Sequence, residues 1–204
     1  MFDYYHLGAL GTQYPLNFSI HNPSSVIKET EKKFDYVKYN PRKNIDRWGL
    51  SLTSLDGGMS GIPDLDSLKE YNRENNTEYE ETDFCVPTKA YEDFKEVLDP
   101  FAPWLFRTHV LKLNPGGYFP PHRDNYGLTS FRLIVPLHNI ETPEYNFVVE
   151  KEILEWKKGQ MYFLDTVKMH YLFNAGSNPS YWLVMNVRCI RESVEKVLYN
   201  LFSG

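Results

Sequence analysis

The chain has 204 residues, with 22 Lys or Arg and 27 Asp or Glu, so its formal net charge is −5. A mildly acidic chain has no general attraction to nucleic acid or to an anionic membrane surface, and neither is expected as a partner. The two cysteines, Cys85 and Cys189, are too few for a disulfide scaffold or a multi-cysteine zinc site.

The composition is that of a globular and β-rich protein. Apolar residues make up 42% and charged residues 24%, and 13 Phe, 15 Tyr and 4 Trp accompany 13 Pro and 12 Gly. Aromatic residues favour strands, whereas Pro and Gly favour turns. No apolar run approaches the roughly 20 residues of a membrane helix. The N-terminus has no basic flank and no long apolar stretch, so we expect no signal peptide and a cytoplasmic location.

The first 103 residues mix short elements with turns. Residues 47–53 predict a strand, and the glycine-rich stretch 54–61 predicts a loop with the composition of a mobile lid. Residues 67–75 predict a short polar helix. Residues 89–98 predict another helix, because Tyr91, Phe94 and Leu98 recur at helical spacing before Pro100.

After Trp104 the pattern becomes a series of short strands. They are predicted at 105–113, 118–122, 130–138, 145–150, 160–165, 169–174 and 181–188, followed by a helix at 193–202. Strands separated every 8–15 residues by turn residues indicate a sandwich or barrel. We therefore predict a single domain: an extension (1–103) packed on a double-stranded β-helix, or jelly-roll, core (104–190), with a C-terminal helix (191–204).

One motif on these strands has the chemistry of a metal site. His122 and Asp124 are two residues apart, so a strand places both side chains on one face. Such a pair also arises by chance, but His170 follows at the start of a later predicted strand. Two imidazoles and a carboxylate from different strands make the 2-His-1-carboxylate triad, which leaves open positions on Fe(II) for oxygen chemistry.

These residues occur in an ordered context. Asn114-Pro115-Gly116-Gly117 precedes His122, and Arg132-Leu133-Ile134-Val135-Pro136-Leu137 follows it. Gly159 then forms a turn before the predicted strand that contains Phe163-Leu164-Asp165, and Asn174 follows His170. In this order and spacing, residues 105–188 resemble the Fe(II)/2-oxoglutarate-dependent dioxygenases, specifically the aspartyl/asparaginyl β-hydroxylase-like branch. The first 100 residues show no family signature.

The resemblance implies a site and a reaction. His122, Asp124 and His170 would bind Fe(II) and carry catalysis, with 2-oxoglutarate as co-substrate. Arg132 would pair with a carboxylate of 2-oxoglutarate, since its planar fork binds carboxylates through two hydrogen bonds. A structural salt bridge is the alternative role for Arg132. The implied reaction is hydroxylation by O2 of a C–H bond in a small polar, amino-acid-like or peptidyl substrate.

The chain departs from the family at one position. The family usually has an arginine about ten residues after the distal histidine, where it anchors the far carboxylate of 2-oxoglutarate; here that residue is Ser180. The expected anchor is therefore Arg132, helped by Ser180, Lys112 or Tyr118. Two alternatives stay open: a cupin-like metal enzyme that does not use 2-oxoglutarate, and a non-catalytic jelly-roll binding module.

Other polar residues have plainer expected roles. We expect His6, His21 and His109 to be structural, whereas His138 shares the strand parity of Arg132 and is a weaker candidate for the site. Two arginines, Arg47 and Arg107, are possible substrate contacts. The pair Glu141 and Glu144 is expected in a surface hairpin rather than in a pair of glycosidase carboxylates.

Overall fold

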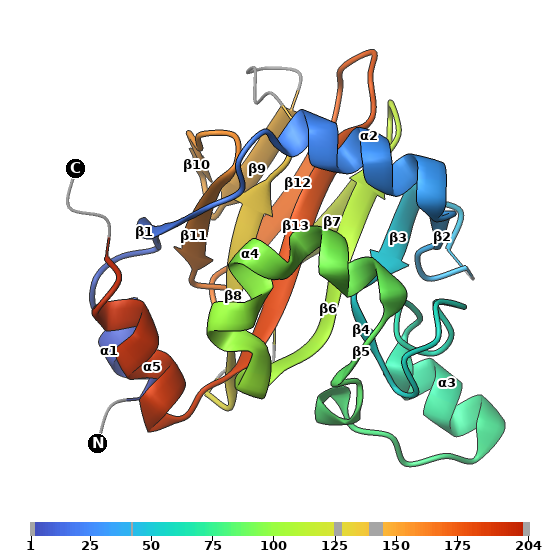
Figure 1. The fold of residues 1–204 in the computed structure, drawn as a ribbon, viewed down its shortest axis with the longest axis horizontal. Coiled ribbons are helices and arrows are strands. Elements are labelled where there is room, and N and C mark those ends of the chain that lie inside the picture. Colours follow the sequence, from blue (N-terminus) through green and yellow to red (C-terminus); the bar gives the residue numbers. More distant parts are fainter. Residues whose placement is uncertain (1–2, 42, 125–127, 139–144, 202–204) are drawn as a thin grey trace.

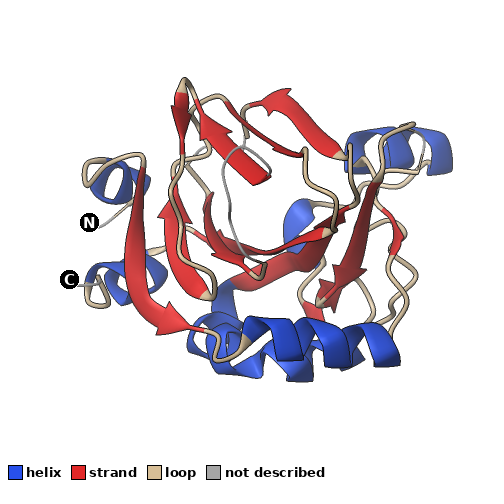
Figure 2. Cartoon of the chain, turned by 90° about the horizontal axis from the view of Figure 1, so that it is seen from above, coloured by secondary structure: helices blue, strands red, loops and turns tan. Residues whose placement is uncertain are grey.

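The computed structural model describes residues 3–41, 43–124, 128–138 and 145–201. Two antiparallel sheets of seven and four strands face each other, and helices lie along the outer side of the larger sheet (Figure 2). This arrangement confirms the predicted jelly-roll class. No helix in the described ranges is long and apolar enough to cross a membrane.

The larger sheet consists, in spatial order, of β1 (Gln13–Ser19), β11 (Gln160–Leu164), β8 (Ser130–Pro136), β13 (Ser180–Arg188), β6 (Leu105–Leu113), β3 (Arg47–Ser51) and β2 (Val37–Lys38). The smaller sheet consists of β10 (Glu152–Ile153), β9 (Tyr145–Val149), β12 (His170–Asn174) and β7 (Tyr118–His122). A separate pair is formed by β4 (Thr53–Ser54) and β5 (Val86–Pro87).

The α-helices are α1 (Tyr4–Gly8), α2 (Pro23–Lys33), α3 (Leu68–Asn75), α4 (Lys95–Leu98) and α5 (Arg191–Leu198). Three 3-10 helices accompany them: η1 (Glu81–Asp83), η2 (Lys89–Phe94) and η3 (Asp99–Trp104). The helix expected over 89–98 is therefore a 3-10 turn that continues into α4. The C-terminal helix begins two residues earlier than expected, and residue 202 lies outside the described residues.

The N-terminal residues are part of the larger sheet. β1 pairs with β11 at one edge, while β3 pairs with β6 near the other (Figure 1). These strands are hydrogen-bonded to the core strands, which is a closer association than an extension packed on the core. No strand was predicted at β1, which is an edge strand and therefore tolerates Pro15.

Each face of the larger sheet buries a different apolar cluster. On β8, Leu133, Val135 and Leu137 face the helices, together with Ile27 of α2. Ile134 faces the smaller sheet and packs in the second cluster, whose members include Leu111, Phe147, Trp156 and Trp182. Successive residues of this segment therefore alternate between the two faces, and the second cluster lies between the two sheets, where the site is found.

The turn before β7 brings the two sheets close together. Gly116 donates to the carbonyl of Asn174, and the carbonyl of Gly117 accepts from the amide of the same residue. A Cβ on Gly117 would overlap the backbone oxygen of Asp46, whereas a Cβ on Gly116 would meet nothing within 4 Å. Only glycine therefore lets this turn lie against the start of β3.

We expect Gly117→Ala to lower the free energy of unfolding by about 2–3 kcal/mol, because the backbone must shift to relieve the overlap. Gly116→Ala is the control. Gly116 has φ of 80°, so alanine there should cost only about 1 kcal/mol of backbone strain. Chemical denaturation of both variants measures the difference, and equal losses would contradict the overlap argument.

Candidate metal centre and its cavity

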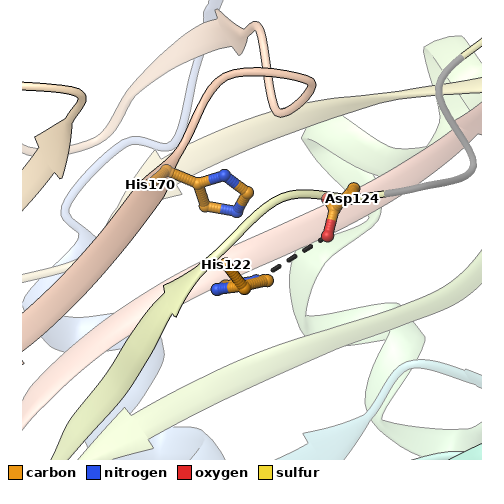
Figure 3. Close-up of side chains that lie close together, drawn as sticks. All are labelled: His122, Asp124 and His170. Carbon is orange, nitrogen blue, oxygen red and sulfur yellow. Dashed lines mark ion pairs between the residues drawn. The ribbon is translucent and has the colours of Figure 1, made fainter.

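His122 and His170 meet on adjacent strands of the smaller sheet. His122 ends β7 and His170 begins β12, and the two are direct antiparallel partners. Their ring centroids are 4.2 Å apart. Asp124 follows two residues after His122, and its amide donates to the carbonyl of Thr166 at 3.0 Å. The chain after β7 is thus tied to the segment before β12, so all three side chains converge (Figure 3).

The three side chains form a donor set that fits a divalent metal. One ligand atom from each of His122, Asp124 and His170 lies within 4.8 Å of the others, and His122 Nε2 is 3.7 Å from Asp124 Oδ1. The Nδ1 of His122 lies 2.8 Å from the carbonyl of Pro120, and that of His170 lies 3.0 Å from the carbonyl of Lys168. Since a carbonyl only accepts, both Nδ1 atoms carry the proton, and both Nε2 lone pairs are available for a metal.

Arg132 controls the charge of the acidic ligand. Its Nε donates to Asp124 Oδ2, and its Nη1 donates to Asn186 Oδ1. Burial would raise the pKa of Asp124, but the guanidinium outweighs it and lowers the pKa to about 2. Burial, reinforced by His122, lowers the pKa of His170 to about 4. At neutral pH the cluster therefore offers a carboxylate and a neutral imidazole, which are the protonation states that metals bind.

The cluster forms part of the wall of a cavity of about 360 Å³ between the sheets. Both apolar and polar side chains line this cavity. The apolar lining is Leu68, Leu111, Phe119, Ile134, Phe147, Leu164, Leu172 and Val184. The charged lining beyond the cluster is Arg47, Asp66, Lys69, Glu81, Arg107 and Arg132. A mostly apolar pocket with a few convergent polar groups is typical of a small-molecule site.

Arg132 lies in this cavity, where it was expected, but its fork is already engaged. The structure pairs it with the carboxylate of Asp124 and with Asn186, which corresponds to the alternative role of a structural salt bridge. Asn186 itself was not singled out in the sequence. The available signal was a polar residue on the apolar strand β13, two positions from Val184, with which it shares a face.

The other expected co-substrate contacts do not line the cavity. Lys112 lies on the opposite face of β6, where its ammonium is 2.7 Å from Glu31 of α2. Tyr118 is 45% exposed to solvent. Ser180 is buried on β13, and its hydroxyl has no hydrogen-bond partner in the described part of the chain.

The remaining histidines differ in their relation to the site. His109 lines the cavity, contrary to its expected purely structural role, although burial lowers its pKa to about 3 and keeps it neutral. His138 packs against Trp182 and contacts the backbone of Tyr181, outside this cavity. The side chain of His21 is 85% exposed. The expected hairpin carboxylates Glu141 and Glu144 lie outside the described residues.

Solved structures of other proteins share this fold. An oxidoreductase of the 2OG-Fe(II) oxygenase family from Burkholderia pseudomallei is 13% identical, with a TM-score of 0.52 over 91% of this chain and 88% of that chain. HygX from Streptomyces hygroscopicus, solved with nickel, 2-oxoglutarate and hygromycin B, is 10% identical, with a TM-score of 0.53 over 90% of this chain and 85% of its own. Identities this low show the fold alone.

The sequence itself is more specific than the fold. No curated protein matches the chain. Residues 88–189, half of the chain, match the family described as aspartyl/asparaginyl beta-hydroxylase, and this range includes the whole donor set. The chain therefore belongs to the aspartyl/asparaginyl β-hydroxylase family of Fe(II)/2-oxoglutarate-dependent dioxygenases.

Proposed function

We propose that His122, Asp124 and His170 bind Fe(II) and that the adjacent cavity binds 2-oxoglutarate. The protein then hydroxylates a C–H bond of a small polar, amino-acid-like or peptidyl substrate. The observation that carries this proposal is the convergence of one ring nitrogen from each histidine and a carboxylate oxygen within 4.8 Å of one another at the wall of a 360 Å³ cavity. The family membership supports the reaction class, while the substrate class rests on the cavity alone.

The bound metal and co-substrate supply oxidation of the C–H bond by O2, with conversion of 2-oxoglutarate to succinate and CO2. The protein supplies position and charge. The backbone carbonyls behind His122 and His170 fix both ring tautomers, and Arg132 holds the Asp124 carboxylate ionised and oriented. The apolar side chains of the cavity exclude water from the reacting bond, which prevents side reactions.

The charged part of the cavity supports a polar substrate. Lys69, Glu81 and Asp66 come from α3, η1 and the loop before α3, on the side of the cavity away from the apolar cluster. Side chains of both signs can bind a molecule that carries both an amine and a carboxylate, as amino acids and peptide termini do. We infer that the substrate enters past these residues.

The test is an anaerobic titration followed by turnover. Addition of 2-oxoglutarate to the Fe(II)-loaded protein should produce a weak visible charge-transfer band, and admission of O2 with amino acids and short peptides should produce succinate. The variant Asp124→Asn is the comparison, since it removes the anionic ligand with little change in volume. A wild-type protein that gives neither the band nor succinate would favour a metal enzyme that does not use 2-oxoglutarate.

A further inference from the structure

We infer that Arg47, on β3, binds the far carboxylate of the 2-oxo acid in this cavity. It would thus perform the role of the usual family arginine, whose position is occupied here by Ser180. The inference rests on the proposed function, because it assumes that the metal cluster holds the other end of the same molecule. It gives a role to a residue outside the part of the chain that matches the family, residues 88–189.

Among the residues that the structure describes, three arginines line the cavity, and two of them are already paired. Arg107 forms an ion pair with Glu81 and donates to the backbone carbonyl of Asp64 at 2.7 Å. Arg132 is paired with Asp124 and Asn186. Arg47 differs from both, because its Nε and Nη1 are buried without a hydrogen-bond partner among the described residues.

The absence of hydrogen-bond partners for Nε and Nη1 among the described residues is unusual because Arg47 is buried. The residue is only 3% exposed, and no carboxylate in the described ranges forms an ion pair with it. A buried guanidinium without a partner is strongly unfavourable. Two aromatic rings compensate in part, since its Cζ lies 4.2 Å from the ring centroid of Phe119 and 5.3 Å from that of Tyr39. A carboxylate ligand would supply the missing hydrogen-bond acceptors.

The guanidinium is placed between the sheets and close to the metal cluster. Arg47 belongs to the larger sheet, whereas Phe119 belongs to β7 of the smaller sheet. The ring of Phe119 lies 5.1 Å from that of His122, so the guanidinium and one metal ligand flank the same phenyl ring. A dicarboxylate held at one end by the metal can therefore present its other end to Arg47.

The strand register relates Arg47 to Ser180. Leu113 of β6 is the direct partner of Arg47 on one side and of Ser180 on the other. Directly paired residues point to the same face of a sheet, and adjacent strands are about 4.8 Å apart. Arg47 and Ser180 thus occupy one row, two strands apart, on the face that borders the cavity.

A second polar atom in this row also has no partner. The hydroxyl of Ser180 is buried, and no described residue hydrogen-bonds to it. Arg47 lines the cavity and Ser180 does not, so the guanidinium of Arg47 is the member of this row that a carboxylate in the cavity can reach.

The test compares two ligands and three proteins. Isothermal titration of the Mn(II)-loaded protein measures 2-oxoglutarate against 2-oxopentanoate, in which a methyl group replaces the far carboxylate. Wild type should prefer 2-oxoglutarate by at least about 30-fold, and Arg47→Met should lose most of that preference. The control is Lys112→Met. Lys112 is next to Leu113 in β6, but its side chain lies on the opposite face of the sheet, where it pairs with Glu31. This variant also removes one cation, and it should bind both acids as wild type does.

Folding is followed separately. Metal-free Arg47→Met should melt no lower than wild type, because an unpaired buried charge is removed. Mn(II) affinity should be unchanged, since Arg47 is not a ligand. Arg47→Lys keeps the charge without the fork, so it should recover only part of the preference, and it provides the same ligand comparison if the methionine variant does not fold.

The possible outcomes separate the inference from the proposed function. If Arg47→Met keeps the wild-type preference, the inference fails: either Arg132 holds the far carboxylate or Arg47 binds a carboxylate of the primary substrate. If wild type binds both acids equally, no far-carboxylate site exists. If wild type binds neither acid in the presence of Mn(II), the proposed function fails and the inference with it.

Discussion

His122→Ala and His170→Ala should each lower Fe(II) affinity by more than about 100-fold, because loss of a group that only hydrogen-bonds to a metal-binding histidine typically costs 10- to 100-fold, and these two residues are proposed to bind the metal directly. Wild type should bind one Fe(II) per chain and gain thermal stability from it. At a metal concentration 100 times the Kd, the gain is about 2.7 kcal/mol. Both variants should lose this stabilisation and also 2-oxoglutarate-dependent succinate formation.

The control is His21→Ala. His21 is exposed and pairs only with Glu96 on the outer surface, so its removal should leave metal affinity unchanged. Anaerobic titration and melting curves with and without metal measure both quantities. The metal-free His122→Ala and His170→Ala proteins should still fold, because neither histidine contacts the cluster between helices and sheet. Full metal affinity in both variants would show that the three residues are not the metal site.

Arg132→Met should lower the free energy of unfolding of the metal-free protein by about 3 kcal/mol, because it leaves the buried Asp124 carboxylate without its cation. The double variant Asp124→Asn/Arg132→Met should recover most of this loss, since no unpaired charge remains. Bound metal supplies a positive charge to Asp124, so the loss should be smaller in the Mn(II)-loaded protein. Urea denaturation of wild type, Arg132→Met and the double variant, each with Mn(II) or with a chelator, measures these differences in the free energy of unfolding.

The loss of unfolding free energy in Arg132→Met should depend on pH in a defined direction. The pKa of Asp124 is lowered from 3.8 to about 2 in the folded protein. A lowered folded-state pKa stabilises the fold above the unfolded pKa, by about 2–3 kcal/mol here, and this contribution is lost as the pH falls to about 2. The difference between wild type and Arg132→Met should therefore be full above pH 4 and shrink below it. A difference that is independent of pH, metal and Asp124 would mean that Arg132 contributes through packing alone.

The donor set could be predicted from the sequence because it depends on local parity. His122 and Asp124 lie two residues apart where the strand period is two, and His170 begins a strand bounded by recognisable turns. The jelly-roll class followed from the series of short strands after Trp104. In the first 103 residues the prediction was weaker, since β1 contains a proline and α2 is mostly polar apart from Pro23, Val26 and Ile27.

Partners across strands could not be predicted in this way. Arg132 was expected to bind a co-substrate carboxylate, but the fold offers it the carboxylate of Asp124 and the amide oxygen of Asn186, which is 54 residues later in the chain. Lys112 was a candidate because it lies on a neighbouring predicted strand, yet the parity of β6 turns its side chain toward α2. Which polar groups pair depends on long-range strand order, and no local pattern encodes that order.

The sequence by itself determined the family, the metal-binding residue types and the absence of the usual arginine at Ser180. Only the tertiary structure decided which of the described cavity arginines is left without an ion pair. Arg47 and Ser180 are 133 residues apart along the chain, and they share a row only because β3 and β13 both pair with β6 at Leu113. Register is fixed by the burial of whole strand faces, so it emerges when the sheets pack and cannot be deduced from either segment alone.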